Sequence, residues 1–134
     1  MKLYSEIVAA HPDHIPAQNN LATMLSDAGR HDEALTHVQK ALSLAPENSA
    51  VVDTYGWILL RQGKVQDGLA SIKRAAGLAP SNPTIAYHLA VAHSKNGEEK
   101  EALEAASRGV GLSKFFPEYN DAVKLRDQLQ EKKK

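Results

Sequence analysis

The stretch that decides the fold is ENSAVVDTYGWILLRQGKVQDGLASIKRAAGLAP, residues 47–80. Its glycine at position 63 has counterparts at Gly29 and Gly97, each 34 residues away, and the Ala-Pro pair that closes it also occurs 34 residues earlier. Self-similarity at a fixed period of 20–50 residues is the sequence signature of repeat architectures. The chain is therefore predicted to be an array of repeated units.

The same frame divides the whole chain into a single repeat domain with two end segments. The expected units are residues 13–46, 47–80 and 81–114, preceded by 1–12 and followed by 115–134. Residues 1–12 overlay the second half of a unit and are expected to form an orphan second helix. Residues 115–134 are expected to form a capping helix that begins with Pro117 in its first turn and runs to about Gln130.

Each unit is predicted to fold as two helices joined by a tight turn. The first helix is expected to open on a polar cap, either Ser49 or Asn82 followed by Pro83. The glycine ends it, because glycine adopts the left-handed conformation without a steric penalty. A second helix, for example from Asp67 towards Leu78, then runs to the closing proline. Two helices joined in this way form an αα-hairpin.

Small residues recur where the helices of a hairpin are expected to approach each other. They are Ala22, Gly56 and Ala90 in the first helices, and Ala34, Gly68 and Ala102 in the second. Larger apolar residues at neighbouring equivalent positions, Leu21, Tyr55 and Leu89, fill the remaining space. A leucine at Gly56 or Ala90 should therefore overpack the hairpin.

Composition and motifs argue against several classes of function. Sixteen basic and sixteen acidic residues cancel, which disfavours a nucleic acid partner, and no apolar run approaches the length of a membrane span. There is no cysteine and no catalytic signature, so neither an enzyme nor a cofactor is expected. His11 and His14 read as a solvated turn rather than a metal site, and His93 reads as a core histidine.

The period, the small-glycine-small framework and the closing proline resemble the tetratricopeptide repeat (TPR) family over residues 13–114. The resemblance implies an all-α, right-handed superhelical solenoid of antiparallel helix pairs. GWILLRQG (56–63) and YHLAVAHSKNG (87–97), with a late FPE segment, look like the last repeats of bacterial TPR proteins linked to exopolysaccharide and envelope-protein export.

In that family the first helices line a concave surface that binds extended peptides or a partner's helix. The inward positions then correspond to Asn19, Asn20, Thr23, Ser26 and Asp27; to Asp53, Thr54, Trp57, Leu60 and Arg61; and to Tyr87, His88, Val91, Ser94 and Lys95. An aromatic centre ringed by polar groups is typical of an interface hot spot. The alternative is that Trp57 only seals the contact between repeats by packing on Tyr87.

The charges at the edge of this surface suggest one specificity and exclude another. Arg61 and Lys95 could hold a carboxylate. The Lys/Asn/Arg clamp with which one TPR subgroup grips a terminal carboxylate is absent, because Asn19, Thr23, Thr54, Thr84 and His88 stand at the matching places.

Two functions follow from the sequence. The first is a non-catalytic adaptor that binds a protein or peptide in the groove. The alternative is a structural module that forms homo-oligomers through residues 1–12 or the capping helix.

Overall fold

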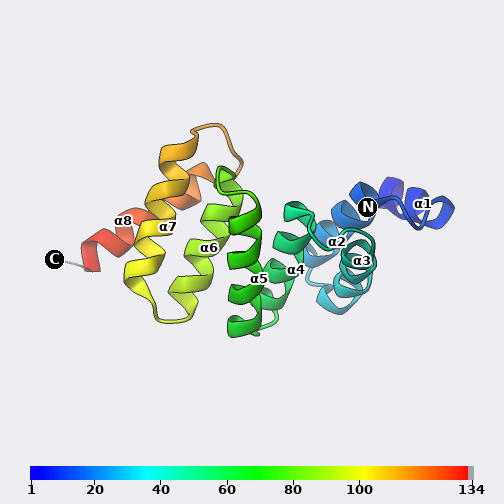
Figure 1. Cartoon of the computed structure of the whole chain (residues 1–134), viewed down its shortest axis with the longest axis horizontal. Coiled ribbons are helices and arrows are strands. Elements are labelled where there is room, and N and C mark those ends of the chain that lie inside the picture. Colours follow the sequence, from blue (N-terminus) through cyan, green and yellow to red (C-terminus); the bar gives the residue numbers. More distant parts are fainter. Residues whose placement is uncertain (133–134) are drawn as a thin grey trace.

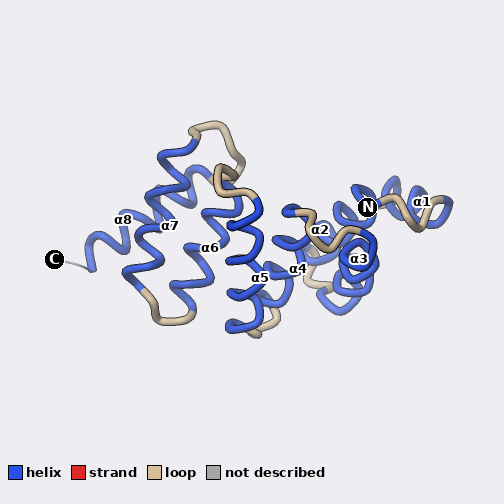
Figure 2. Tube along the Cα trace, in the orientation of Figure 1, coloured by secondary structure: helices blue, strands red, loops and turns tan. Residues whose placement is uncertain are grey.

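The computed structural model describes residues 1–132; Lys133 and Lys134, the last two residues of the expected capping segment, lie outside the described residues. Within 1–132 the chain forms eight α-helices and no strand, as Figures 1 and 2 show. They are α1 (Lys2–Ala10), α2 (Ile15–Asp27), α3 (His31–Leu44), α4 (Ser49–Arg61), α5 (Val65–Leu78), α6 (Pro83–Lys95), α7 (Glu99–Leu112) and α8 (Tyr119–Lys132). The predicted all-α solenoid is confirmed.

The helices form an elongated array, with α1 at one end and α8 at the other (Figure 1). Contacts are densest within the pairs α2/α3, α4/α5 and α6/α7, and each pair then packs on the next. Such nearest-neighbour packing is the hallmark of a solenoid. None of the described helices is both long enough and apolar enough to cross a membrane.

The first helix of each pair begins at a side-chain cap. The Asn48 side chain accepts a hydrogen bond from the Val51 backbone N–H at 3.2 Å, and Asn82 does the same for Ile85 at 3.1 Å. The expectation that Ser49 is a cap is wrong, because the amide oxygen one residue earlier already occupies that position. In the first pair His14 takes the role, with its Nδ1 accepting from a backbone N–H.

Glycine ends each of these helices, as predicted. Gly29, Gly63 and Gly97 have φ values of 81°, 85° and 77°, in the left-handed region that favours glycine. After α4, the N–H of Lys64 donates to the Leu59 carbonyl at 3.0 Å. Hydrogen bonds of this kind satisfy carbonyls at a helix end and turn the chain back for the second helix.

The two helices of the middle pair approach each other through their glycines. A Cβ at Gly56 would lie 2.8 Å from Ile72 Cγ1 and 2.9 Å from the Gly68 carbonyl oxygen. A Cβ at Gly68 would lie 2.8 Å from the Gly56 carbonyl oxygen and 2.9 Å from the Leu60 nitrogen. The predicted close approach is confirmed, and it brings the backbones of α4 and α5 into direct contact.

The core runs along the array and is built from side chains of both helix sets. Leu21, Val38 and Ile58 are buried in one cluster of apolar residues, and Ile72 and Ile85 belong to the clusters that follow it. The clusters contain residues of neighbouring pairs, so each pair completes the burial of the next.

The two ends of the array are covered to different degrees. Helix α1 contains no buried residue: Tyr4 and Val8 pack against the first cluster, but 65% of the Leu3 surface is exposed. At the other end α8 begins at Tyr119, so the expectation that Pro117 lies in its first turn is wrong. Pro117 belongs to the preceding turn, after the buried ring of Phe116.

Two glycines of α5 should respond in opposite ways to alanine. Gly68→Ala should lower the free energy of unfolding by about 1–3 kcal/mol, because its Cβ would collide with backbone atoms of α4. Gly77→Ala should raise it by about 0.5–1 kcal/mol, because nothing lies within 4 Å of the new Cβ and alanine favours the helix. Urea unfolding followed by circular dichroism measures both, and equal stability of the two variants would contradict the close approach.

Candidate functional site

A groove of about 540 Å³ is formed by α2, α4 and α6, with the start of α8 as its far wall. Its lining residues are Asn19, Thr23, Ser26, Asp27, Ala50, Asp53, Thr54, Trp57, Ile58, Arg61, Asn82, Thr84, Ile85, Tyr87, His88, Glu118 and Asp121. Because the lining comes from all three first helices, the groove exists only when successive helix pairs are stacked.

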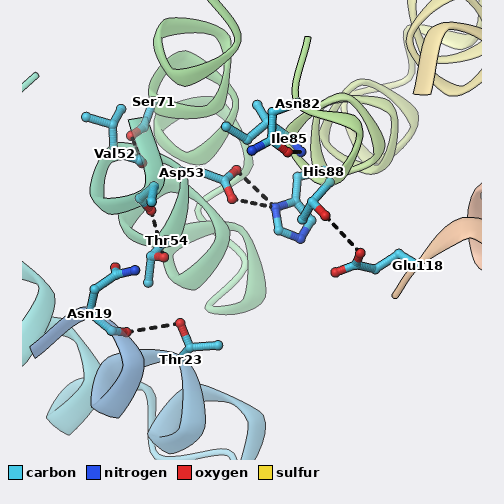
Figure 3. A network of polar contacts seen from close by, with 12 residues as sticks. Asn19, Thr23, Val52, Asp53, Thr54, Ser71, Asn82, Ile85, His88 and Glu118 are labelled. Atoms are coloured by element: carbon cyan, nitrogen blue, oxygen red, sulfur yellow. Dashed lines mark hydrogen bonds and ion pairs between the residues drawn. The ribbon is translucent and has the colours of Figure 1, made fainter. Parts of the chain in front are cut away.

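A buried contact between a histidine and a carboxylate joins α4 to α6 in the groove. His88 Nδ1 lies 2.8 and 2.9 Å from the two carboxylate oxygens of Asp53, and both side chains are buried (Figure 3). A ring nitrogen this close to a carboxylate carries the proton and donates it, so Asp53 fixes both the orientation and the tautomer of His88.

Trp57 stacks on the histidine that Asp53 holds. The centroids of the Trp57 and His88 rings are 4.0 Å apart, with an angle of 17° between the planes. Part of the indole surface stays exposed, and Trp57 also packs against the core cluster that contains Leu60. The tryptophan is therefore a rigid element of the groove, and its stacking partner is His88 rather than the expected Tyr87.

Arg61 ties α4 back to α2. Its Nη1 donates to Asp27 at 2.7 Å and to the Ser26 hydroxyl at 3.1 Å, and its guanidinium carbon lies 5.1 Å from the centroid of the Trp57 ring. A guanidinium over an indole face is a favourable cation–π contact. Arg61 is thus already engaged with a carboxylate of its own chain.

The residues that open α8 close the other side of the groove. Thr84 in the first turn of α6 donates to Glu118 at 3.0 Å. Half-buried Tyr87 lies on the same wall. Burial, and then the negative charges of Asp121 and Glu118, raise the pKa of its hydroxyl. This wall is therefore electronegative.

Most of the residues expected in the groove lie there, and five do not. The expected residues that line it are Asn19, Thr23, Ser26, Asp27, Asp53, Thr54, Trp57, Arg61, Tyr87 and His88. Leu60 is only 3% exposed and packs with Leu69 and Ile72, so the expectation that it faces the groove is wrong. Val91, Ser94 and Lys95 line a neighbouring crevice between α6 and α8, and Asn20 is exposed outside the groove.

Sequence reasoning missed the contribution of the capping segment. Glu118 and Asp121 lie on the groove wall, whereas periodicity within 115–134 predicts only which face of α8 is apolar. The signal that was available is the order of residues in FPEYND (116–121), with acids on both sides of the tyrosine at the helix start.

Two other places in the molecule have site-like features. A second hollow of about 230 Å³ lies between α5, α6 and α7, and its lining mixes small apolar residues with His93, Glu101 and Arg108. Within residues 1–132, His93, Glu98 and Glu101 form one group whose ligand atoms all lie within 4.8 Å of one another. Hydrogen bonds from Asn96 and His93 lower the pKa of Glu98, so its carboxylate already has partners at this turn.

Solved structures with the same fold include proteins of similar length. MamA is 19% identical and has a TM-score of 0.71, with 97% of this chain and 84% of that chain covered. YrrB, a TPR protein with an unusual peptide-binding site, is 18% identical with a TM-score of 0.78, over 97% of this chain and 66% of that one. At such identities the likeness concerns the fold.

The Yersinia enterocolitica type III secretion chaperone SycD, in complex with a peptide of the translocator YopD, is 19% identical. Its TM-score is 0.76, over 91% of this chain and 96% of that chain. No curated protein sequence matches the chain. The family model described as tetratricopeptide repeat matches residues 19–110, which is more than half of the sequence. With its helix pairs, left-handed glycines and small contact residues, the chain belongs to the tetratricopeptide repeat family.

Proposed function

We propose that this chain is a non-catalytic interaction module that binds a peptide or a partner helix in the groove. The observation that carries the proposal is the preformed aromatic floor, in which Asp53 holds His88 and His88 holds Trp57. A binding surface whose side chains are already fixed loses less conformational entropy when a ligand arrives. The half-exposed indole is thus a ready anchor for an apolar or aromatic side chain of the ligand.

The polar groups around this floor suit a polypeptide. Thr23, Thr54 and Thr84 bring hydroxyls to the groove, and Asn19 brings an amide that can both donate and accept. The Asn19 Oδ1 atom is buried and has no hydrogen-bond partner among the described residues. A backbone N–H of an extended segment would supply such a partner once the Asn19 side chain turns this oxygen towards the groove. The peptide-binding site of YrrB and the bound peptide of SycD, proteins of the same fold, support this class of ligand.

The surroundings of His88 favour binding over catalysis. A histidine that activates a nucleophile shares a hydrogen bond with it. The hydrogen bonds of the His88 side chain in the described part of the chain go to Asp53 alone, from Nδ1. The Asp–His pair therefore serves to position the ring on which Trp57 stacks.

Removing the aromatic groups should abolish binding without unfolding the chain. Peptides selected from a displayed random 12-residue library on the wild type should bind Trp57→Ala/Tyr87→Ala at least tenfold more weakly, as expected for hot-spot residues. Biolayer interferometry measures the affinity, and circular dichroism checks the fold. Thr23→Trp, which fills the groove from an exposed position, should weaken binding in the same way without creating a cavity.

Phe115→Ala is the matched control for that experiment, because Phe115 is an aromatic residue with 96% of its surface exposed outside the groove. It should bind the selected peptides like the wild type. Peptides that bind all of these variants equally, or a library that yields no binder to the wild type, would contradict the groove as the site.

A second candidate function is self-association through α1. This helix buries none of its residues, and Leu3 and Ile7 leave apolar surface exposed next to the half-covered first cluster. Apolar surface at the end of a solenoid calls for a cap or a partner. A second copy of the chain would supply one by placing its own α1 against this face.

Charges on this face should separate the two candidates. If copies associate through α1, Leu3→Glu/Ile7→Glu should convert a dimer of the wild type into a monomer, because burying two carboxylates opposes the contact. Analytical ultracentrifugation measures the mass, and Lys2→Glu/Glu6→Gln changes charge on the same helix as a control. A wild type that is monomeric at high micromolar concentration rules out this candidate and leaves the groove proposal untouched.

A further inference from the structure

The groove has an excess of negative charge, although the chain as a whole is neutral. Four of its lining residues carry carboxylates, namely Asp27, Asp53, Glu118 and Asp121, and a single guanidinium, that of Arg61, faces them. The chain therefore has no net charge but has a local negative potential in the groove. A concave surface of one sign attracts ligands of the opposite sign, because its walls concentrate the field lines.

Two of the four carboxylates are already matched within the chain. Arg61 donates to Asp27 at 2.7 Å, and Asp53 accepts from His88 at 2.8 Å. For the same reason the sequence-based idea that Arg61 holds a ligand carboxylate loses its basis. A second carboxylate at Arg61 would have to compete with Asp27 and would enter a groove that is already acidic.

The other two carboxylates have no such partner. In residues 1–132 no lysine, arginine or histidine forms an ion pair with Glu118 or Asp121. Glu118 accepts a hydrogen bond from the neutral Thr84 hydroxyl, and Asp121 is exposed in the first turn of α8. Their charges therefore remain available to a ligand.

Tyr87 gives these carboxylates an aromatic neighbour. The raised pKa of its hydroxyl has burial as the first cause and the charges of Asp121 and Glu118 as the next, so both carboxylates act on this ring. An aromatic face beside carboxylates is a favourable environment for an ammonium or guanidinium group, through cation–π attraction and charge-assisted hydrogen bonds. We call Tyr87, Glu118 and Asp121 the acidic wall.

Nearby cations limit the acidic wall on one side. Lys95 and Lys124 line the crevice between α6 and α8, to which Tyr87 and Asp121 also contribute. The field is thus negative towards the groove and changes sign towards this crevice. We therefore expect the positive charge of a ligand to bind on the groove side of this wall, next to Glu118 and Thr84.

We propose that the ligand of the groove is a basic peptide segment, with a lysine or arginine side chain held at the acidic wall while an apolar side chain packs on Trp57. This inference rests on the proposed function and specifies its ligand. The hydroxyls of Thr54 and Thr84, which also line the groove, can accept hydrogen bonds from the peptide backbone. Such a peptide must carry its lysine or arginine close enough in sequence to an apolar residue for both side chains to reach the groove at once.

The test is a selection from a displayed random 12-residue peptide library. Peptides selected on the wild type should be enriched in lysine and arginine, and their affinity should fall as salt is raised. Glu118→Gln/Asp121→Asn should bind the same synthetic peptides about fivefold more weakly, the upper range for exposed ion pairs. Glu118→Lys/Asp121→Lys should instead select peptides enriched in aspartate and glutamate.

A matched control removes two acids elsewhere. Glu47→Gln/Glu104→Gln changes the net charge of the chain by the same amount at exposed positions outside the groove, and should bind like the wild type. Intrinsic fluorescence of Trp57, the single tryptophan of the chain, reports on the groove in titrations of the variants that keep this residue, with peptides that contain no tryptophan.

The outcomes separate this inference from the proposed function. If selected peptides bind in a way that needs Trp57 but show no basic enrichment, or if Glu118→Gln/Asp121→Asn binds them like the control, the groove function stands and the acidic wall is overturned. If the wild type selects no peptide, or if binding is indifferent to Trp57→Ala/Tyr87→Ala, the proposed function fails and the inference fails with it.

Discussion

The contact between two helix backbones at Gly56 and Gly68 is the constraint on which the rest of the molecule depends. A Cβ at either position would lie within 3 Å of an atom of the partner helix, so the α4/α5 pair closes only without side chains there. Ala22 and Ala90 are fully buried at the corresponding places in the other first helices. Close pairing in turn fixes how the first helices present their remaining faces, and those faces make the groove.

The groove is a product of stacking between pairs rather than of any one pair. Its floor needs Asp53 from α4 and His88 from α6, and its edge needs Arg61 from α4 and Asp27 from α2. A buried carboxylate without a partner would be costly, so the contact of Asp53 with His88 depends on correct stacking and also reinforces it. The Arg61–Asp27 pair is more exposed and adds a weaker tie between α4 and α2. Polar contacts between successive helix pairs thus act together with the apolar core to fix how the pairs stack.

The sequence predicts the repeat and the positions of the turns, because both are encoded by spacing, and its resemblance to the tetratricopeptide repeat family implies most of the groove-lining residues. Gly29, Gly63 and Gly97 mark turns that have no other good solution for the backbone. Spacing does not predict that the Leu60 side chain points into the core. Leu60 follows Trp57 by three residues, and residues at this spacing are neighbours on a helix surface. Nor does spacing predict that Glu118 and Asp121 join the groove, because this depends on how α8 folds back on the last pair.

The division of the groove among α2, α4, α6 and α8 has a mechanical consequence. In a solenoid, a small rotation at each junction accumulates into the pitch of the whole superhelix. Here the groove spans these junctions, so the same rotation changes the separation between Trp57 and the start of α8. The width of the groove and the pitch of the array therefore change together. A ligand that fills the groove therefore opposes changes in the pitch of the superhelix. In the other direction, a twist applied to the two ends of the molecule widens or narrows the binding groove.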